Sequence, residues 1–381
     1  MAKNIGKRLC QIQQQSSYWK GYRDRVRSAA VRESVNPLTG EKALVLAPGI
    51  CPMNTVSLRT GEPLFLTLAS HVVPKPGAEI KCMIKALPGH NIVSYDFQSQ
   101  ELQGLSAYSA SYSGVSGSTP FDYGNLVGDK KTKTDVHSLV AQKAGTGRDA
   151  AKQSIYAICY GGGAKAVART ICLWHPEYDR TLATRFAKKI IANFKGTKAR
   201  GQTRFAGGTA SLAFNKMLDL LAKPKPISPL LGTAMAPATW PANCGQMASP
   251  GQMNWMVQNL GSSMLHATIV GNWYYARKHN IHAPLAITCH DEEAYQIRSH
   301  QARMFAYIMQ IVHCQTWCLL HYKLGIFDMP TGRAFMQVSI DSVWRKEPKQ
   351  TIETPTYKLL TKGKDLSIID LSAEGELLYA N

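Results

Sequence analysis

The stretch Ser94-Tyr95-Asp96-Phe97-Gln98-Ser99-Gln100-Glu101-Leu102 ends an apolar run that begins at His90. This pattern predicts a buried strand over 90 to 97, with Asp96 at its end, and a helix from about Ser99. A carboxylate held by a rigid sheet is well placed to bind a hard divalent cation through oxygen. The same aspartate also suits a turn or helix cap, and Glu101 suits the first turn of the next helix.

A second acidic cluster, Cys289-His290-Asp291-Glu292-Glu293, lies between two apolar runs that predict short strands over 285 to 289 and 293 to 297. Adjacent acids in a hairpin turn usually face solvent. However, Asp96 and Asp291 together supply two separate carboxylates at strand ends. That is the minimum for holding two metal ions about 3.5 to 4 Å apart, as two-metal phosphoryl transfer requires.

A basic and aromatic stripe follows from the spacing of Arg148, Lys152, Tyr156 and Tyr160, which recur every four residues in a predicted helix over 148 to 159. The two cations can hold phosphates, while the two rings can lie against a base or a sugar. An exposed basic turn with two core tyrosines is the plainer interpretation. His137, one helix earlier, is a further candidate phosphate donor.

A polar stripe runs along the predicted long helix over 250 to 278, where Asn254, Gln258, Ser262 and His266 are spaced by four among apolar residues. Amide and imidazole donors of this kind can meet the minor-groove acceptors that every base pair presents. Simple solvent exposure explains the stripe equally well.

The composition favours a folded protein with a polyanionic partner. The chain has 381 residues, 45% of them hydrophobic, and its 44 Lys and Arg against 25 Asp and Glu give a net charge of +19. Counterion release rewards each phosphate that such a surface neutralises, so nucleic acid leads the candidates. A membrane partner is not expected, because no run approaches the roughly 18 apolar residues of a span. The nine scattered cysteines fit a reducing compartment.

The remaining patterns predict an α+β fold. Further helices are expected over 137 to 144, 178 to 194, 209 to 221 and 300 to 320, and a further strand over 335 to 340. The Gly/Ser/Tyr-rich segment 106 to 128 is expected to be an irregular loop. The basic and aromatic first fifty residues suggest an attachment arm. His313, Cys314 and Cys318 favour core packing over a metal site.

Taken in order, these segments resemble the polymerase domain of family A DNA polymerases, most closely the mitochondrial gamma branch. Asp96 to Leu102 is similar to motif A, Arg148 to Gly161 to the motif B helix, and His290-Asp291-Glu292 to motif C. The resemblance extends from about residue 50 to about residue 347. Two positions depart from the gamma pattern: Gln252 stands where an arginine is usual, and Leu58 replaces the first of two arginines.

The resemblance implies a role for each matching residue. Asp96 and Asp291 would hold two Mg2+ ions, for which Mn2+ can substitute, and Lys152 would assist the leaving pyrophosphate. Glu101 would select deoxynucleotides against ribonucleotides. The incoming dNTP would be bound by Arg148, Lys152, Tyr156, Tyr160, His137, Glu101 and Gln100. Primer-template DNA would be contacted by Arg59, Asn254, Gln258 and His290.

The implied fold is a right-hand polymerase, with an antiparallel palm sheet, helical fingers and the thumb largely absent. Its expected segments are a basic arm over 1 to 50, the first part of the palm over 51 to 134, the fingers over 135 to 206 and the second part of the palm over 207 to 381. Only about fifty residues precede the first matching motif, so no proofreading exonuclease is expected. The hypothesis is the polymerase subunit of a split phage or viral enzyme, whose arm (Tyr18 to Arg32) docks a separate thumb, exonuclease or processivity subunit.

Two other classes stay open. A single-subunit RNA polymerase would use the same arrangement of palm carboxylates, although the motifs that contain Glu101 and Glu292 resemble those of the DNA enzymes. A non-catalytic DNA-binding remnant would have lost a metal ligand or a phosphate-binding cation, yet Asp96, Asp291, Arg148 and Lys152 are all present. The expected location is the cytoplasm of a bacterial host, with the mitochondrion as runner-up.

Overall fold

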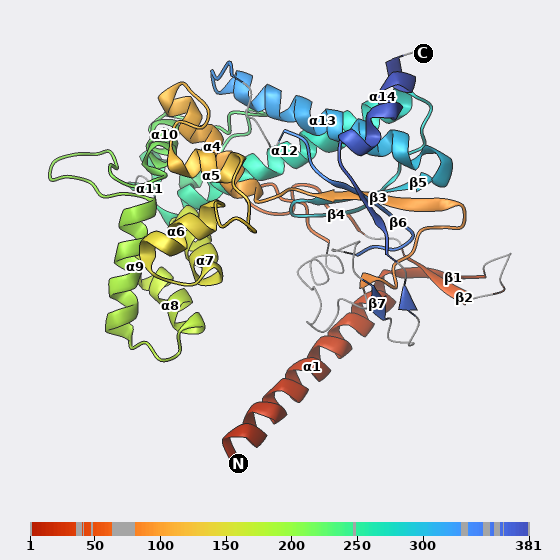
Figure 1. The fold of residues 1–381 in the computed structure, drawn as a ribbon, viewed down its shortest axis with the longest axis horizontal. Helices are drawn as coiled ribbons and strands as arrows, with labels where there is room; N and C mark the ends of the chain where they lie inside the picture. The colour runs from red at the N-terminus through yellow and green to blue at the C-terminus, as the bar shows by residue number, and fades with distance from the viewer. Residues whose placement is uncertain are drawn as a thin grey trace. The chain divides into compact units, whose positions relative to one another are not determined.

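The computed structural model describes residues 2–35, 40, 42–46, 49–62, 81–246, 249–328, 334–345, 351–353, 359–360 and 362–379. Residues 346 and 347, at the end of the resembling region, lie outside these ranges. The chain forms two compact units (Figure 1). The first unit consists of residues 1–97, 268–312 and 335–381, and the second of residues 98–267 and 313–334. The four segments expected from the motifs stay a prediction.

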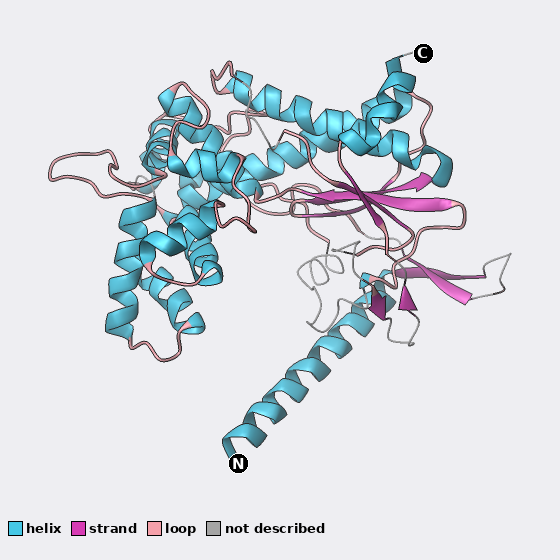
Figure 2. Ribbon diagram, in the orientation of Figure 1, coloured by secondary structure: helices cyan, strands magenta, loops and turns pink. Residues whose placement is uncertain are grey.

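An open antiparallel sheet forms the centre of the first unit (Figure 2). Its strand order is β4-β5-β3-β6-β9, and every neighbouring pair is antiparallel. The bounds are β3 His90–Asp96, β4 Leu285–Cys289, β5 Glu292–Arg298, β6 Val338–Asp341 and β9 Lys364–Leu366. The predicted strand over 335 to 340 therefore begins and ends later than expected.

The two faces of this sheet are both covered, because side chains alternate along each strand. On one face, Tyr295 contacts Phe305 of α13 (Ala302–Lys323), with ring centroids 4.9 Å apart. On the other face, Ile92 and Ala294 pack in an apolar cluster with Tyr22. Burial on both sides explains why the middle residues of β3, Ile92 to Tyr95, are all buried.

The first fifty residues are more regular than the expected arm. They form a helix, α1 (Ala2–Ala29), and a hairpin of β1 (Ala30–Val35) and β2 (Lys42–Leu46). Tyr22 is 1% exposed in the sheet's apolar cluster, which Val26 and Ala29 also join. The start of α1 has no such packing: Ile5, Leu9 and Ile12 are each more than half exposed.

The second unit is helical. Its helices are α4 Gln100–Ser113, α5 Pro120–Leu126, α6 Val136–Ala144, α7 Arg148–Cys159, α8 Ala164–Trp174, α9 Arg180–Phe194, α10 Ser211–Leu221 and the short η1 Pro237–Thr239 and α11 Pro241–Cys244. The helix α12 (Pro250–Lys278) begins in this unit and ends with residues assigned to the first, and α13 begins with residues of the first unit and ends with residues of the second.

The expected irregular loop over 106 to 128 is wrong for most of its length. It contains the end of α4 and the whole of α5. Thr119 caps α5 by accepting a hydrogen bond from the amide of Asp122, and Pro120 occupies the first helical position. These are ordinary helix-start signals that the Gly/Ser composition obscured. By contrast, the bounds of α7 and α12 agree with the predicted helices.

The remaining short elements belong to the first unit. They are η2 Ser299–Gln301, β7 Ile352–Glu353, β8 Leu359–Leu360, η3 Ile369–Leu371 and α14 Ser372–Tyr379. Among the helices described, none combines the length and the apolar character needed to cross a bilayer.

Candidate active site

Asp96 and Asp291 lie at neighbouring strand ends of the first unit. β3 ends at Asp96, which is in register with Glu292, the first residue of β5. The amide of Phe97 donates to the carbonyl oxygen of Asp291 over 2.9 Å, which ties the two backbones together. Both aspartates are half-buried. The structure therefore brings together two acids that are far apart in the sequence.

The turn that carries Asp291 is strained at His290. β4 and β5 pair through Cys289 and Glu292, which leaves His290 and Asp291 as a two-residue hairpin turn. His290 is exposed and has a φ of 57°, in the left-handed region that a two-residue turn usually fills with glycine, asparagine or aspartate. Such conformations cluster at functional sites, because the surrounding structure must hold them against strain.

Glu292, next to Asp291, is held inside the first unit by Lys81 and Trp344, two residues that belong to none of the predicted motifs. Its carboxylate accepts from Lys81 Nζ at 3.2 Å and from the Trp344 indole. Lys81 is 1% exposed and lies 3.9 Å above the centre of the Trp344 ring. This buried cluster fixes the residue that follows Asp291, so it supports the position of the turn.

Glu293 faces the opposite side of the sheet and is fully buried. The hydroxyls of Tyr95, Tyr295 and Thr268 and the amide of Asn272 all donate to its carboxylate. Burial raises the pKa of Glu293, and the donated hydrogen bonds oppose that rise. The carboxylates of Glu292 and Glu293 therefore accept hydrogen bonds from buried residues. Asp96 and Asp291 lie where the strands end.

The second unit contains the predicted basic and aromatic stripe on α7. Lys152 is exposed, and Arg148, Tyr156 and Tyr160 are half-exposed, while the opposite side of the helix is buried. The rings of His137 and Tyr156 lie 6.0 Å apart and those of Tyr156 and Tyr160 lie 6.2 Å apart. His137 on α6 therefore packs beside the α7 stripe, but it is itself buried, at 3% exposure. Its role as a phosphate donor stays a prediction.

Glu101 contacts the α7 stripe from α4. The Tyr160 hydroxyl donates to the Glu101 carboxylate over 2.8 Å, and Glu101 is only 9% exposed. Gln100 is less exposed than expected for a residue that contacts a nucleotide. It is 1% exposed, and its amide donates to the carbonyl of Gly261 on α12 over 2.9 Å.

The candidate DNA-contacting residues are distributed over both units. Asn254 and Gln258 are half-buried on α12, among buried apolar neighbours. Arg59 is 8% exposed in the first unit, where its amide donates to Thr55 Oγ1 over 2.9 Å. Gln252, one of the two departures, is buried and donates to the carbonyls of Thr239 and Gln246. It therefore orders the loop before α12.

The donor set suits Mg2+ better than a metal held entirely by protein. Within the described residues, no group of three or more His, Cys, Asp or Glu side chains could hold a metal ion. Asp96 and Asp291 could supply hard oxygen ligands from strand ends of the sheet. Mg2+ is commonly bound by one or two carboxylates together with substrate phosphates and water, which is what this pair can offer.

Comparisons with known proteins identify related sequences and a related fold. No protein-family model matches the chain. DNA polymerase gamma of Schizosaccharomyces pombe is 30% identical over 383 residues, which cover 96% of this chain and 38% of that protein. DNA polymerase gamma of Saccharomyces cerevisiae is 30% identical over 382 residues, covering 95% of this chain and 30% of that protein. The chain thus spans well under half the length of these curated relatives.

A solved structure shares the fold. It is described as the POL domain of Pol1 from M. smegmatis in complex with DNA primer-template and dNTP. The two match with a TM-score of 0.58 and 10% sequence identity over 84% of this chain and 50% of the other. The mixed arrangement of helices and an open antiparallel sheet is therefore that of this polymerase domain.

Proposed function

The chain is a family A polymerase domain by sequence and by fold, and on that premise we propose that it catalyses template-directed DNA synthesis, adding dNTPs to a primer 3'-hydroxyl. The single observation that carries the proposal is the pairing of Asp96 with Asp291. The backbones around these two residues, 195 positions apart in sequence (291 − 96), are hydrogen-bonded at one end of the neighbouring strands β3 and β5. The carboxylates of the adjacent Glu292 and Glu293 accept hydrogen bonds from buried partners.

The two aspartates would hold two divalent metal ions through oxygen. When bound, such ions lower the charge on the attacking and leaving oxygens of an in-line displacement. The contribution of the chain is to keep both carboxylates at fixed strand ends, where the Phe97 to Asp291 backbone bond and the buried Glu292 cluster limit their movement. Positioning of this kind supplies much of the catalysis in phosphoryl transfer.

The surface of α6 and α7 would bind the incoming nucleotide. Arg148, Lys152 and His137 would contact the triphosphate, and Lys152 would also donate to the leaving pyrophosphate. Tyr160 and Tyr156 would lie against the sugar and base. The hydrogen bond from Tyr160 to Glu101 supports a role in sugar selection, because it holds a carboxylate beside the ring that would meet the ribose. The 2'-hydroxyl of a ribonucleotide would then clash with the Glu101 carboxylate.

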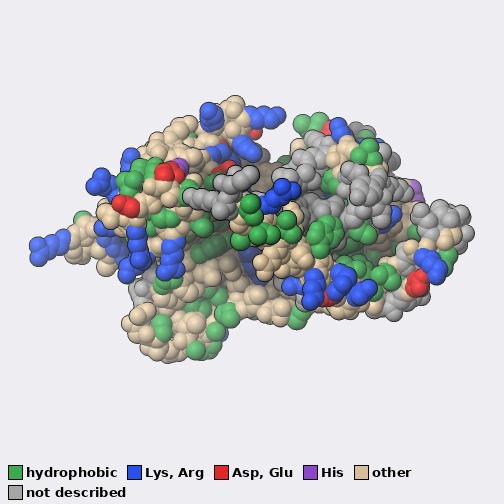
Figure 3. Space-filling view, turned by 90° about the horizontal axis from the view of Figure 1, so that it is seen from below, with side chains coloured by type: hydrophobic (Ala, Val, Ile, Leu, Met, Phe, Trp, Pro, Cys, Tyr) green, Lys and Arg blue, Asp and Glu red, His purple; other side chains and the backbone are tan. Residues whose placement is uncertain are grey.

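Primer-template DNA would contact Arg59, Asn254, Gln258 and His290. Gln100 would act on the nucleotide only through packing, by fixing α4 against α12 next to Glu101. Figure 3 shows Lys and Arg side chains gathered over α8 and α9. Exposed cations there are Lys165, Arg169, Arg180, Arg185, Lys188 and Lys189. These would add sequence-independent attraction to phosphates.

The chain would work with a further subunit. A helix whose first turns expose Ile5, Leu9 and Ile12 is suited to packing against a thumb, exonuclease or processivity subunit. We propose α1 as that docking element in a split polymerase. A phage or viral origin belongs to the same proposal. The names of the Neurospora crassa and Drosophila melanogaster relatives include the word mitochondrial, which favours the mitochondrion as the location.

Primer extension on a defined template tests the function. The wild-type chain, alone and with co-purifying proteins, should extend a primer with Mg2+ and dNTPs. Asp96→Ala and Asp291→Ala should each lower extension at least a thousandfold, whereas Glu33→Ala, which removes an exposed acid of the same unit, should match wild type. Wild-type extension by Asp96→Ala would refute the catalytic assignment. Preference for NTPs would favour the RNA polymerase alternative.

A further inference from the structure

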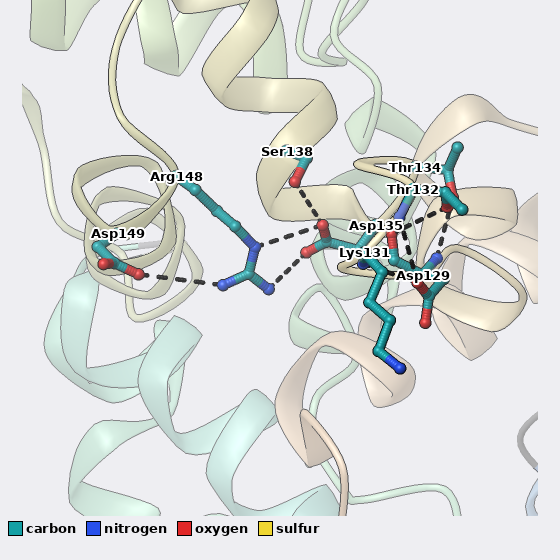
Figure 4. A network of polar contacts seen from close by, with 8 residues as sticks. All are labelled: Asp129, Lys131, Thr132, Thr134, Asp135, Ser138, Arg148 and Asp149. Atoms are coloured by element: carbon teal, nitrogen blue, oxygen red, sulfur yellow. Dashed lines mark hydrogen bonds and ion pairs between the residues drawn. The ribbon is translucent and has the colours of Figure 1, made fainter.

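An ion pair in the second unit links the residue before α6 to the first residue of α7. The guanidinium of Arg148 donates from Nη2 to Asp135 Oδ2 at 2.7 Å and from Nε to Asp135 Oδ1 at 3.3 Å (Figure 4). This is a two-point contact along one edge of the guanidinium, the geometry that fixes its plane as well as its position. The Asp135 side chain is 8% exposed and that of Arg148 is 29% exposed.

Asp135 occupies a helix-cap position without acting as a cap. It precedes α6 in extended conformation, yet its side chain accepts no hydrogen bond from the first amides of that helix. Aspartate at this position usually satisfies such an amide. Here Oδ1 accepts instead from the Ser138 hydroxyl and from Arg148, and Oδ2 accepts from Arg148. The carboxylate is thus used to hold the arginine.

The preceding loop fixes Asp135 from the other side. Asp129 Oδ1 accepts from the amides of Lys131 and Thr132 at 2.7 and 3.2 Å, and the Asp129 amide donates to Thr134 Oγ1 at 2.9 Å. Figure 4 shows this loop next to Asp135. Burial of Asp135 works against its ionised form, but hydrogen bonds from Arg148 and Ser138 and the charge of Arg148 outweigh it and lower the pKa.

One edge of Arg148 remains available. Nη1 has no hydrogen bond among the described residues and comes within 4.0 Å only of Asp149, whose side chain is 67% exposed. The same face of α7 carries Lys152 one turn further on, with Tyr156 and Tyr160 beyond it. A guanidinium held along its Nε–Nη2 edge therefore presents Nη1 next to the surface assigned to the incoming nucleotide.

We propose that Asp135 is a positioning residue, which orients Arg148 so that its remaining edge binds the triphosphate of the incoming dNTP. This inference rests on the proposed function. Asp135 itself touches no substrate. Its effect on nucleotide binding passes entirely through Arg148, so loss of the carboxylate should weaken dNTP binding only while the arginine is present.

A double-mutant cycle tests this in primer extension. Asp135→Asn keeps the shape of the side chain and suits a helix cap, so folding is expected to persist. It should raise the KM for dNTP about tenfold, with kcat and the affinity for primer-template changed less than twofold. Combined with Arg148→Ala, it should add less than twofold to the KM of the single Arg148→Ala variant. Asp149→Asn is the matched control and should stay within twofold of wild type.

Two results would overturn the inference. A lower KM for Asp135→Asn would mean that the carboxylate competes with the triphosphate for Arg148. An equal rise in KM with and without Arg148 would mean that Asp135 acts only on the structure of α6. If the wild-type chain extends no primer, the proposed function fails, and the same cycle is measured by calorimetric binding of dATP with Mg2+. A wild-type chain that binds no dATP overturns both proposals.

Discussion

Replacing Lys81 with methionine tests how much the buried ion pair between Lys81 and Glu292 stabilises the fold next to Asp291. Lys81 and Glu292 side chains are 1% and 6% exposed, and their charged atoms lie 3.2 Å apart. Methionine keeps most of the unbranched stem of lysine and removes only the ammonium group. Glu292 would then retain the Trp344 indole as donor but lose its cation.

The expected loss of stability is large for a single substitution. Removal of one partner from a buried ion pair costs about 3 to 5 kcal/mol, because the remaining charge stays desolvated without compensation. The contact of the ammonium with the Trp344 ring, at 3.9 Å, lies within this figure and accounts for up to about 2 kcal/mol of it. The double variant Lys81→Met/Glu292→Gln removes both charges of this pair, so it should recover at least half of the loss.

Equilibrium unfolding in urea, followed by tryptophan fluorescence at pH 7, measures these differences. Lys42→Met is the matched control, since that side chain is 75% exposed in its pair with Glu33 and should change stability by less than about 0.5 kcal/mol. A loss below about 1 kcal/mol for Lys81→Met, or a double variant less stable than the single one, would refute the reasoning. Primer extension by Lys81→Met should also fall, because Glu292 adjoins Asp291.

Two further substitutions test packing in the second unit. Asp122 is fully buried, and burial raises its pKa from 3.8 to about 6, so the folded chain favours the protonated acid. Its contribution to stability should fall by roughly 2 kcal/mol as the pH rises from 4 to 7. Asp122→Asn should remove this contribution from the pH dependence measured by urea unfolding, and an unchanged pH dependence would contradict the assignment. Gly261→Ala would place Cβ 2.4 Å from the Gln100 amide oxygen and should lower stability by about 1 to 3 kcal/mol in thermal unfolding. The control Gly251→Ala has open space around it in the same helix and should be neutral or slightly stabilising. Equal stability of the two variants would count against the close contact.

Local patterns in the sequence were enough for much of the fold. The four-residue spacing of Arg148, Lys152, Tyr156 and Tyr160 predicted α7, and the bounds of α12 followed from one unbroken helical pattern. Both depend on neighbours within a turn or two. The prediction of an irregular loop over 106 to 128 was wrong because it relied on the composition of the whole segment. Thr119 and Pro120 are a specific start signal for α5.

Local sequence patterns alone placed Asp96 and Asp291 next to short strands, with a basic, aromatic helix between them in the chain. The three-dimensional fold was needed to establish that β3 and β5 are neighbours, which brings the backbones of those acids together at one end of the strands, and that Lys81 and Trp344 contact Glu292. It likewise decided that Asp135 holds Arg148 instead of capping its own helix. The physical reason is that these contacts join residues up to 211 positions apart, and their strength depends on burial, which no local pattern encodes.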